Sequence, residues 1–118
     1  MPMERMQSGA RMSQVVIHNQ TIYLAGQVAS GAPGGSVAEQ TKDILSKVDA
    51  LLAQAKSDKS RILSATIWLT DMSTFGEMNS VWEAWVVPGA TPARATVVSP
   101  QLASPEFKIE ISIIAAQS

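Results

Sequence analysis

The stretch F-K-I-E-I-S-I-I-A-A, from Phe107 to Ala116, decides the fold that this sequence predicts. Apolar side chains recur at every second position, a period that is typical of a β-strand with one buried face. Glu110 stands at the centre of the other face, which becomes apolar towards its end at Ile114. A carboxylate in that place lies either at a wet surface or in a pocket with a partner.

A second stretch, T-P-A-R-A-T-V-V from Thr91 to Val98, contains one arginine and no other charge. Pro92 favours an extended chain and a β-prone run follows, so we expect Arg94 to lie on a strand. Its planar guanidinium presents a fork of donors that fits a carboxylate, which makes it a candidate anion clamp. The alternatives are a structural ion pair or a surface side chain with an apolar stem. We expect the strands that carry Arg94 and Glu110 to be antiparallel neighbours.

The N-terminal part of the chain predicts a β-hairpin. Two short β-rich runs, Gln14 to His18 and Thr21 to Ala25, flank the pair Asn19-Gln20. Asparagine tolerates positive φ, so this pair is typical of a tight turn. Residues 1–12 are polar and rich in methionine, and we interpret them as an arm without regular structure.

A helix and a central strand are predicted next. Ser36 and Glu39 form an S-x-x-E capping box, and apolar residues follow at helical spacing over about Val37 to Ala55. Ile62 to Thr70 is rich in β-branched and aromatic residues, which favours a strand at the centre of the sheet.

A second helix is expected to begin at another capping box, made by Thr74 and Glu77, and to run to about Val86. Trp82 and Trp85 belong to its apolar stripe. We interpret them as core residues and not as a stacking platform for bases, because no basic residue nearby could hold a phosphate backbone.

The expected order is β-β-α-β-α-β-β in a single α+β domain over residues 1–118. Two helices that alternate with strands should pack on one face of a single mixed sheet. No further helix is available for the other face. We therefore expect other subunits to cover it.

Composition excludes several classes of function. Nine basic and ten acidic residues give a net charge of −1, so no overall field attracts nucleic acid or an anionic membrane. The chain has no cysteine and one histidine, too few ligands for a zinc site or for thiol chemistry, and we expect neither a metal nor a cofactor. It contains no signal-peptide core and no apolar run of membrane-spanning length, so we expect a cytoplasmic protein.

The pattern P-A-R-x-x-V at Pro92 to Val97, followed by a Pro-containing loop and K-I-E-I at Lys108 to Ile111, resembles the signature of the RidA/YjgF family of enamine and imine deaminases, also called the RutC family. The stretches Ala10 to Gly26, Ala65 to Asp71 and Phe75 to Val87 look most like its YoaB branch. The resemblance implies a chorismate-mutase-like (YjgF-like) fold and a homotrimer with its sheets inside and its helices outside.

The resemblance also implies active sites in clefts between subunits. Arg94 matches the arginine that binds the substrate carboxylate, and Glu110 matches the glutamate that holds or activates a water molecule. Asn79 matches an asparagine that lines the site, and Gly26 a glycine whose backbone N–H faces the ligand. The implied activity is metal-free hydrolysis of 2-imino or enamine acids to 2-keto acids and ammonia.

Three positions of the implied pocket depart from the RidA archetype. Met12 replaces a tyrosine, Ala25 a serine and Thr96 a cysteine. Two hydroxyl donors are therefore missing. This loss favours the alternative of a trimer that binds or senses a small carboxylate, such as a 2-keto acid, without catalysis.

Overall fold

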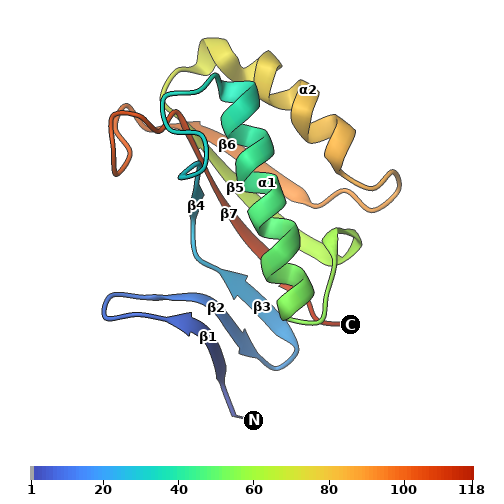
Figure 1. Cartoon of the computed structure of the whole chain (residues 1–118). Coiled ribbons are helices and arrows are strands. Elements are labelled where there is room, and N and C mark those ends of the chain that lie inside the picture. The colour runs from blue at the N-terminus through green and yellow to red at the C-terminus, as the bar shows by residue number, and fades with distance from the viewer. Residues whose placement is uncertain (1) are drawn as a thin grey trace.

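The computed structural model describes residues 2–118 as one mixed sheet with two helices on one face (Figure 1). This confirms the predicted fold class. The strands form one sheet in the order β1-β2-β3-β7-β5-β6, and the short β4 pairs with β7. The elements are β1 (Glu4–Ser8), β2 (Ser13–His18), β3 (Thr21–Leu24), β4 (Gln27–Val28), α1 (Val37–Gln54), β5 (Ile62–Leu69), α2 (Phe75–Trp85), β6 (Ala93–Val98) and β7 (Ile109–Ala116).

Strand β5 lies between β6 and β7, so the predicted pairing of the last two strands is wrong. Strand β6 runs parallel to β5 because α2 carries the chain back across the sheet before β6 begins. Strand β7 then pairs antiparallel with the other side of β5. Ala65 of β5 is the partner of Arg94 on one side and of Ile113 on the other.

The two faces of the sheet differ in their cover. On β7 the alternate residues Ile109, Ile111 and Ile113 are buried beneath the helices. The opposite face has no helix over it (Figure 1). Tyr23 and Val97 keep 45% and 42% of their surface exposed, and the register places them on that open face, on which Glu110 also lies.

Two segments contain strands that the sequence did not predict. Glu4 to Ser8 form β1, which pairs with β2, so the prediction that residues 1–12 contain no regular structure is wrong. The two-residue β4 follows Gly26. The predicted hairpin turn is confirmed, because Asn19 and Gln20 have φ values of 50° and 62°.

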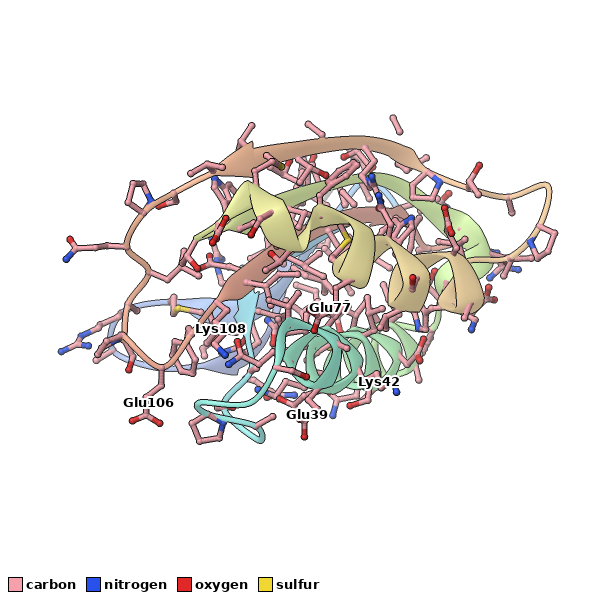
Figure 2. All side chains as sticks on the ribbon, turned by 90° about the horizontal axis from the view of Figure 1, so that it is seen from above. Glu39, Lys42, Glu77, Glu106 and Lys108 are labelled. Atoms are coloured by element: carbon pink, nitrogen blue, oxygen red, sulfur yellow. The ribbon has the colours of Figure 1, made fainter. Side chains whose placement is uncertain are left out.

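The first capping box is confirmed and the second is wrong. Ser36 accepts from Glu39 N, and the Glu39 side chain accepts from Ser36 N. Thr74 lies at the end of a 3₁₀ turn with φ −91° and ψ 5°, and its hydroxyl donates to the Asp71 carbonyl instead of capping α2. Glu77 instead reaches the first turn of α1 (Figure 2), where it accepts from Ala38 N at 2.8 Å.

Gln40 on α1 fixes the segment that leads into β7. Its side chain is fully buried. The amide Nε2 donates to the Glu106 carbonyl at 2.8 Å and to the Gly35 carbonyl at 3.2 Å, and Oε1 accepts from Lys108 N at 2.8 Å. The backbone entering β7 is therefore held two residues before Glu110.

Replacing Gln40 by leucine keeps most of the side-chain volume and leaves the Lys108 N–H and the Glu106 carbonyl short of a partner. We expect the free energy of unfolding to fall by about 2–3 kcal/mol. Gln54→Leu is the matched control, because Gln54 is exposed on the same helix, and should change stability by no more than about 0.5 kcal/mol. Urea denaturation measures both; equal effects would mean that the Gln40 hydrogen bonds do not hold this segment.

Candidate functional site

Arg94 is held against α2 by one hydrogen bond and two aromatic rings. It lies on β6, and Nη1 donates to Asn79 Oδ1 at 2.8 Å. The guanidinium carbon stands 5.7 Å from the centre of the Phe75 ring and 5.5 Å from that of the Trp82 ring. Arg94 and Asn79, two of the predicted site residues, are therefore in contact within one chain.

The positive charge of Arg94 has no acidic partner in the part of the chain that the structure describes. The groups that contact the guanidinium are neutral: an amide oxygen and two ring faces. Over residues 2–118, Nε and Nη2 have no hydrogen-bond partner. These two N–H groups point the same way and form the edge of the guanidinium that can donate two parallel hydrogen bonds to a carboxylate. A structural ion pair, the alternative interpretation of this arginine, is absent among the residues that the structure describes.

Thr96 lies two residues beyond Arg94 on the same face of β6. Its hydroxyl oxygen is buried and has no hydrogen-bond partner among the described residues. Buried hydroxyls are normally paired, so an unpaired one is a donor and acceptor available to a ligand or to another chain. Its position supports Thr96 as part of the site around Arg94.

Glu110 lies on the open face, half-buried beside Gly26 and paired through its backbone with Val28 and Trp68. Burial raises the pKa of its carboxyl above the ordinary value for glutamate. A Cβ atom at position 26 would collide with Glu110 Oε2. Gly26 is therefore needed for this glutamate to hold its position.

The predicted residues form two groups on opposite faces of the sheet. Arg94, Asn79 and Thr96 lie on the helix side. Gly26 and Glu110 lie on the open face, and Ala25 directly precedes Gly26, with its N–H bonded to the Gln14 carbonyl at 2.9 Å. Met12 is exposed in the loop between β1 and β2. One chain by itself therefore does not bring the arginine and the glutamate together.

The contacts of Phe75 and Trp82 with Arg94 were not predicted, because Trp82 was expected only as a core residue in the apolar stripe of the second helix. The spacing Phe75, Asn79, Trp82 places an amide between two rings on one face of α2. A polar residue inside an apolar stripe was the available signal for a polar partner on the facing strand.

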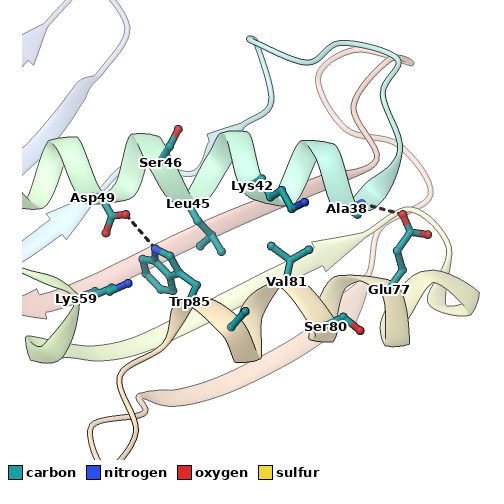
Figure 3. A pocket seen from close by; sticks show the side chains of 11 residues that line it. Ala38, Lys42, Leu45, Ser46, Asp49, Lys59, Glu77, Ser80, Val81 and Trp85 are labelled. Atoms are coloured by element: carbon teal, nitrogen blue, oxygen red, sulfur yellow. Dashed lines mark hydrogen bonds between the residues drawn. The ribbon is translucent and has the colours of Figure 1, made fainter.

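The groove between the two helices is separate from these residues. It has a volume of about 660 Å³ and is lined by Leu45, Asp49, Val81 and Trp85 among others (Figure 3). None of the predicted site residues lines it. Residues 2–118 contain no group of His, Cys, Asp and Glu side chains able to hold a metal ion, and no described helix is long and apolar enough to cross a membrane.

Glu110→Gln should raise thermal stability at pH 7, because the folded protein no longer buries a charge. A carboxyl with a raised pKa in the folded state destabilises that state above the raised pKa, and this effect disappears as pH falls below the unfolded value. The melting temperature of the variant should therefore exceed that of the wild type at pH 7 and approach it near about pH 4. Glu83→Gln removes an exposed carboxylate of α2 and is the control: its melting temperature should not differ from that of the wild type in this pH-dependent way. If the difference in melting temperature between Glu110→Gln and the wild type grew as the pH fell, a buried charge on Glu110 would be contradicted.

Comparisons with known proteins cover almost the whole chain. The sequence profile of the family described as Endoribonuclease L-PSP matches residues 3–117. A RutC family protein of Haemophilus influenzae is 44% identical over 98% of both chains, and the RutC family protein YoaB of Escherichia coli is 45% identical over 98% of this chain and 99% of its own. A 2-iminobutanoate/2-iminopropanoate deaminase of Rattus norvegicus is 35% identical over 89% of this chain and 79% of its own.

A solved structure agrees with the fold. The crystal structure of a YjgF family member from Neisseria meningitidis superposes with a TM-score of 0.95 at 42% identity, covering 100% of this chain and 97% of that one. Sequence and structure thus agree with the resemblance carried by the strands of Arg94 and Glu110. The chain belongs to the YjgF/RidA family, also called the RutC family.

Proposed function

We propose that this protein hydrolyses 2-imino or enamine acids to 2-keto acids and ammonia, with Arg94 as the carboxylate clamp. The observation that carries the proposal is the uncompensated charge of Arg94, whose guanidinium is held by neutral groups and keeps its Nε–Nη2 edge free. Relatives at 35% identity are named imine deaminases, which supports the reaction class. Relatives at 44–45% identity are named only as RutC family proteins.

Glu110 is the proposed base of the reaction. The oxygen of a water molecule bonds to the C=N carbon while the Glu110 carboxylate takes a proton from that water. Glu110 passes this proton to the imine nitrogen, which gives an intermediate with one hydroxyl and one amino group on the same carbon. The hydroxyl proton is then transferred to the amino nitrogen as the C–N bond breaks and the C=O bond forms, and ammonia leaves. Burial raises the pKa of Glu110, and a raised pKa makes the carboxylate a better proton acceptor near neutral pH. Every step balances without a metal or a redox partner.

The complete site requires two copies of the chain. Arg94 and Glu110 lie on opposite faces of one sheet, so neither can reach a ligand held by the other within a single subunit. The open face, with Tyr23 and Val97 exposed, is the surface that a second subunit would cover. We propose a homotrimer in which Arg94 of one subunit and Glu110 of another share each site.

Binding without catalysis is the second candidate function. It is favoured by Met12 and Ala25, which supply no hydroxyl where the RidA archetype has a tyrosine and a serine. Arg94 and Thr96 alone suffice to hold a small carboxylate. In that case the clamp would bind a 2-keto acid and Glu110 would not affect any rate.

The experiment mixes two inactive variants. Arg94→Ala removes the clamp, and Glu110→Gln should lower turnover by about 10²- to 10⁴-fold because it removes the base. After both variants are unfolded together and refolded as mixed trimers, each mixed trimer contains one site with both native residues, so the mixture should recover about a quarter of wild-type activity. Keto-acid formation from imines that an amino-acid oxidase generates is the readout.

Each variant refolded alone is the control and should stay inactive. Recovery in the mixture supports a site shared between subunits. No recovery from a mixture proven by mass spectrometry to contain mixed trimers would contradict the shared site. Wild-type rates equal to uncatalysed hydrolysis for every imine, together with binding of 2-keto acids, would replace the enzyme by the binding protein.

A further inference from the structure

We propose that Phe75 and Trp82 are positioning residues for Arg94: their ring faces fix the plane of the guanidinium so that its free edge is presented to a carboxylate. This inference deepens the proposed function and rests on it for the identity of the ligand. The geometry of the arginine itself is measurable without any ligand.

Three side chains of α2 act on one guanidinium. Phe75, Asn79 and Trp82 are four and three residues apart, so they lie on one face of the helix. Both ring centres are within the range of about 6 Å in which a cation is attracted to an aromatic face, at 5.7 and 5.5 Å. Asn79 Oδ1 accepts from Nη1 at 2.8 Å.

Rings hold the guanidinium without neutralising it. An acidic partner would also fix an arginine, but it would occupy donors and cancel the charge that a ligand carboxylate needs. Aromatic faces attract the cation through their quadrupole and leave its edge donors free. This accounts for the two aromatic side chains beside an arginine that is proposed to bind a carboxylate.

The Trp82 ring is held in place by its burial and by Trp85. It is buried, with 5% of its surface exposed, and packs against Trp85 with ring centres 5.5 Å apart. Trp85 in turn donates from Nε1 to Asp49 Oδ2 at 3.0 Å, which ties the ring pair to α1 (Figure 3). Phe75 is 38% exposed, so it can be replaced with less effect on folding than Trp82.

The test records the Nε–Hε signal of Arg94 in the full-length protein labelled with ¹⁵N-arginine, assigned by its loss in Arg94→Lys. Phe75→Leu removes one ring and keeps an apolar side chain. We expect it to shift the Hε signal, to speed its exchange with water, and to weaken the binding of pyruvate, the probe ligand, by about three- to tenfold. Phe75→Tyr and Trp82→Phe keep an aromatic face and should stay within about twofold of the wild type.

Met78→Leu, a buried substitution on the same helix, is the control for changes in packing and should leave the Hε signal in place. An unchanged signal and unchanged pyruvate affinity in folded Phe75→Leu would overturn the positioning role, whatever Arg94→Ala does. Faster exchange of Hε with water in Phe75→Leu together with a wild type that binds no 2-keto acid would support the positioning role and refute the proposed ligand. The two failures are therefore distinguishable.

Discussion

Strand β5 pairs with β6 on one side and with β7 on the other, and this double pairing sets the face of the sheet on which Arg94, Thr96 and Glu110 lie. Successive side chains of a strand point to opposite faces. The register aligns Arg94 with Ala65 and Ile113, on the helix side, and Glu110 with Trp68 and Val97, on the open face. A shift of either strand pairing by one residue would move the side chains of the shifted strand to the other face of the sheet. The separation of Arg94 and Glu110 is thus a property of the sheet, which is why the proposed site needs a second subunit.

Arg94 and Glu110, the two charged residues of the proposed site, differ in their surroundings. Arg94 keeps its charge because neutral groups surround it, whereas burial disfavours the charge of Glu110 and raises its pKa. These are the properties expected of a receptor for an anion and of a carboxylate that acts as a base. Gly26 contributes by its missing side chain, since any Cβ there would collide with the Glu110 carboxylate.

Local patterns in the sequence predicted the elements well, because they depend on neighbouring residues. The period-two run gave β7, and the Ser36–Glu39 capping box marked the start of α1. The neighbour of β7 was predicted wrongly because it depends on the crossover through α2, which places β6 on the far side of β5. The contact between Trp82 and Arg94 was missed for a similar reason. Helical periodicity shows that a ring points inward, but not that an arginine on a distant strand stands beneath it.

The central claim is that Arg94 is an anion receptor because no acidic group neutralises it, and Asn79→Asp tests this most directly. The substitution keeps the shape of the side chain that binds Nη1 and adds a negative charge at 2.8 Å from it. We predict that pyruvate affinity, measured by calorimetry, falls by about ten- to a hundredfold while the melting temperature does not fall. Asn79→Ala, which removes the hydrogen bond and leaves the charge of Arg94 free, should weaken binding less. Wild-type affinity in the folded Asn79→Asp variant would contradict the account.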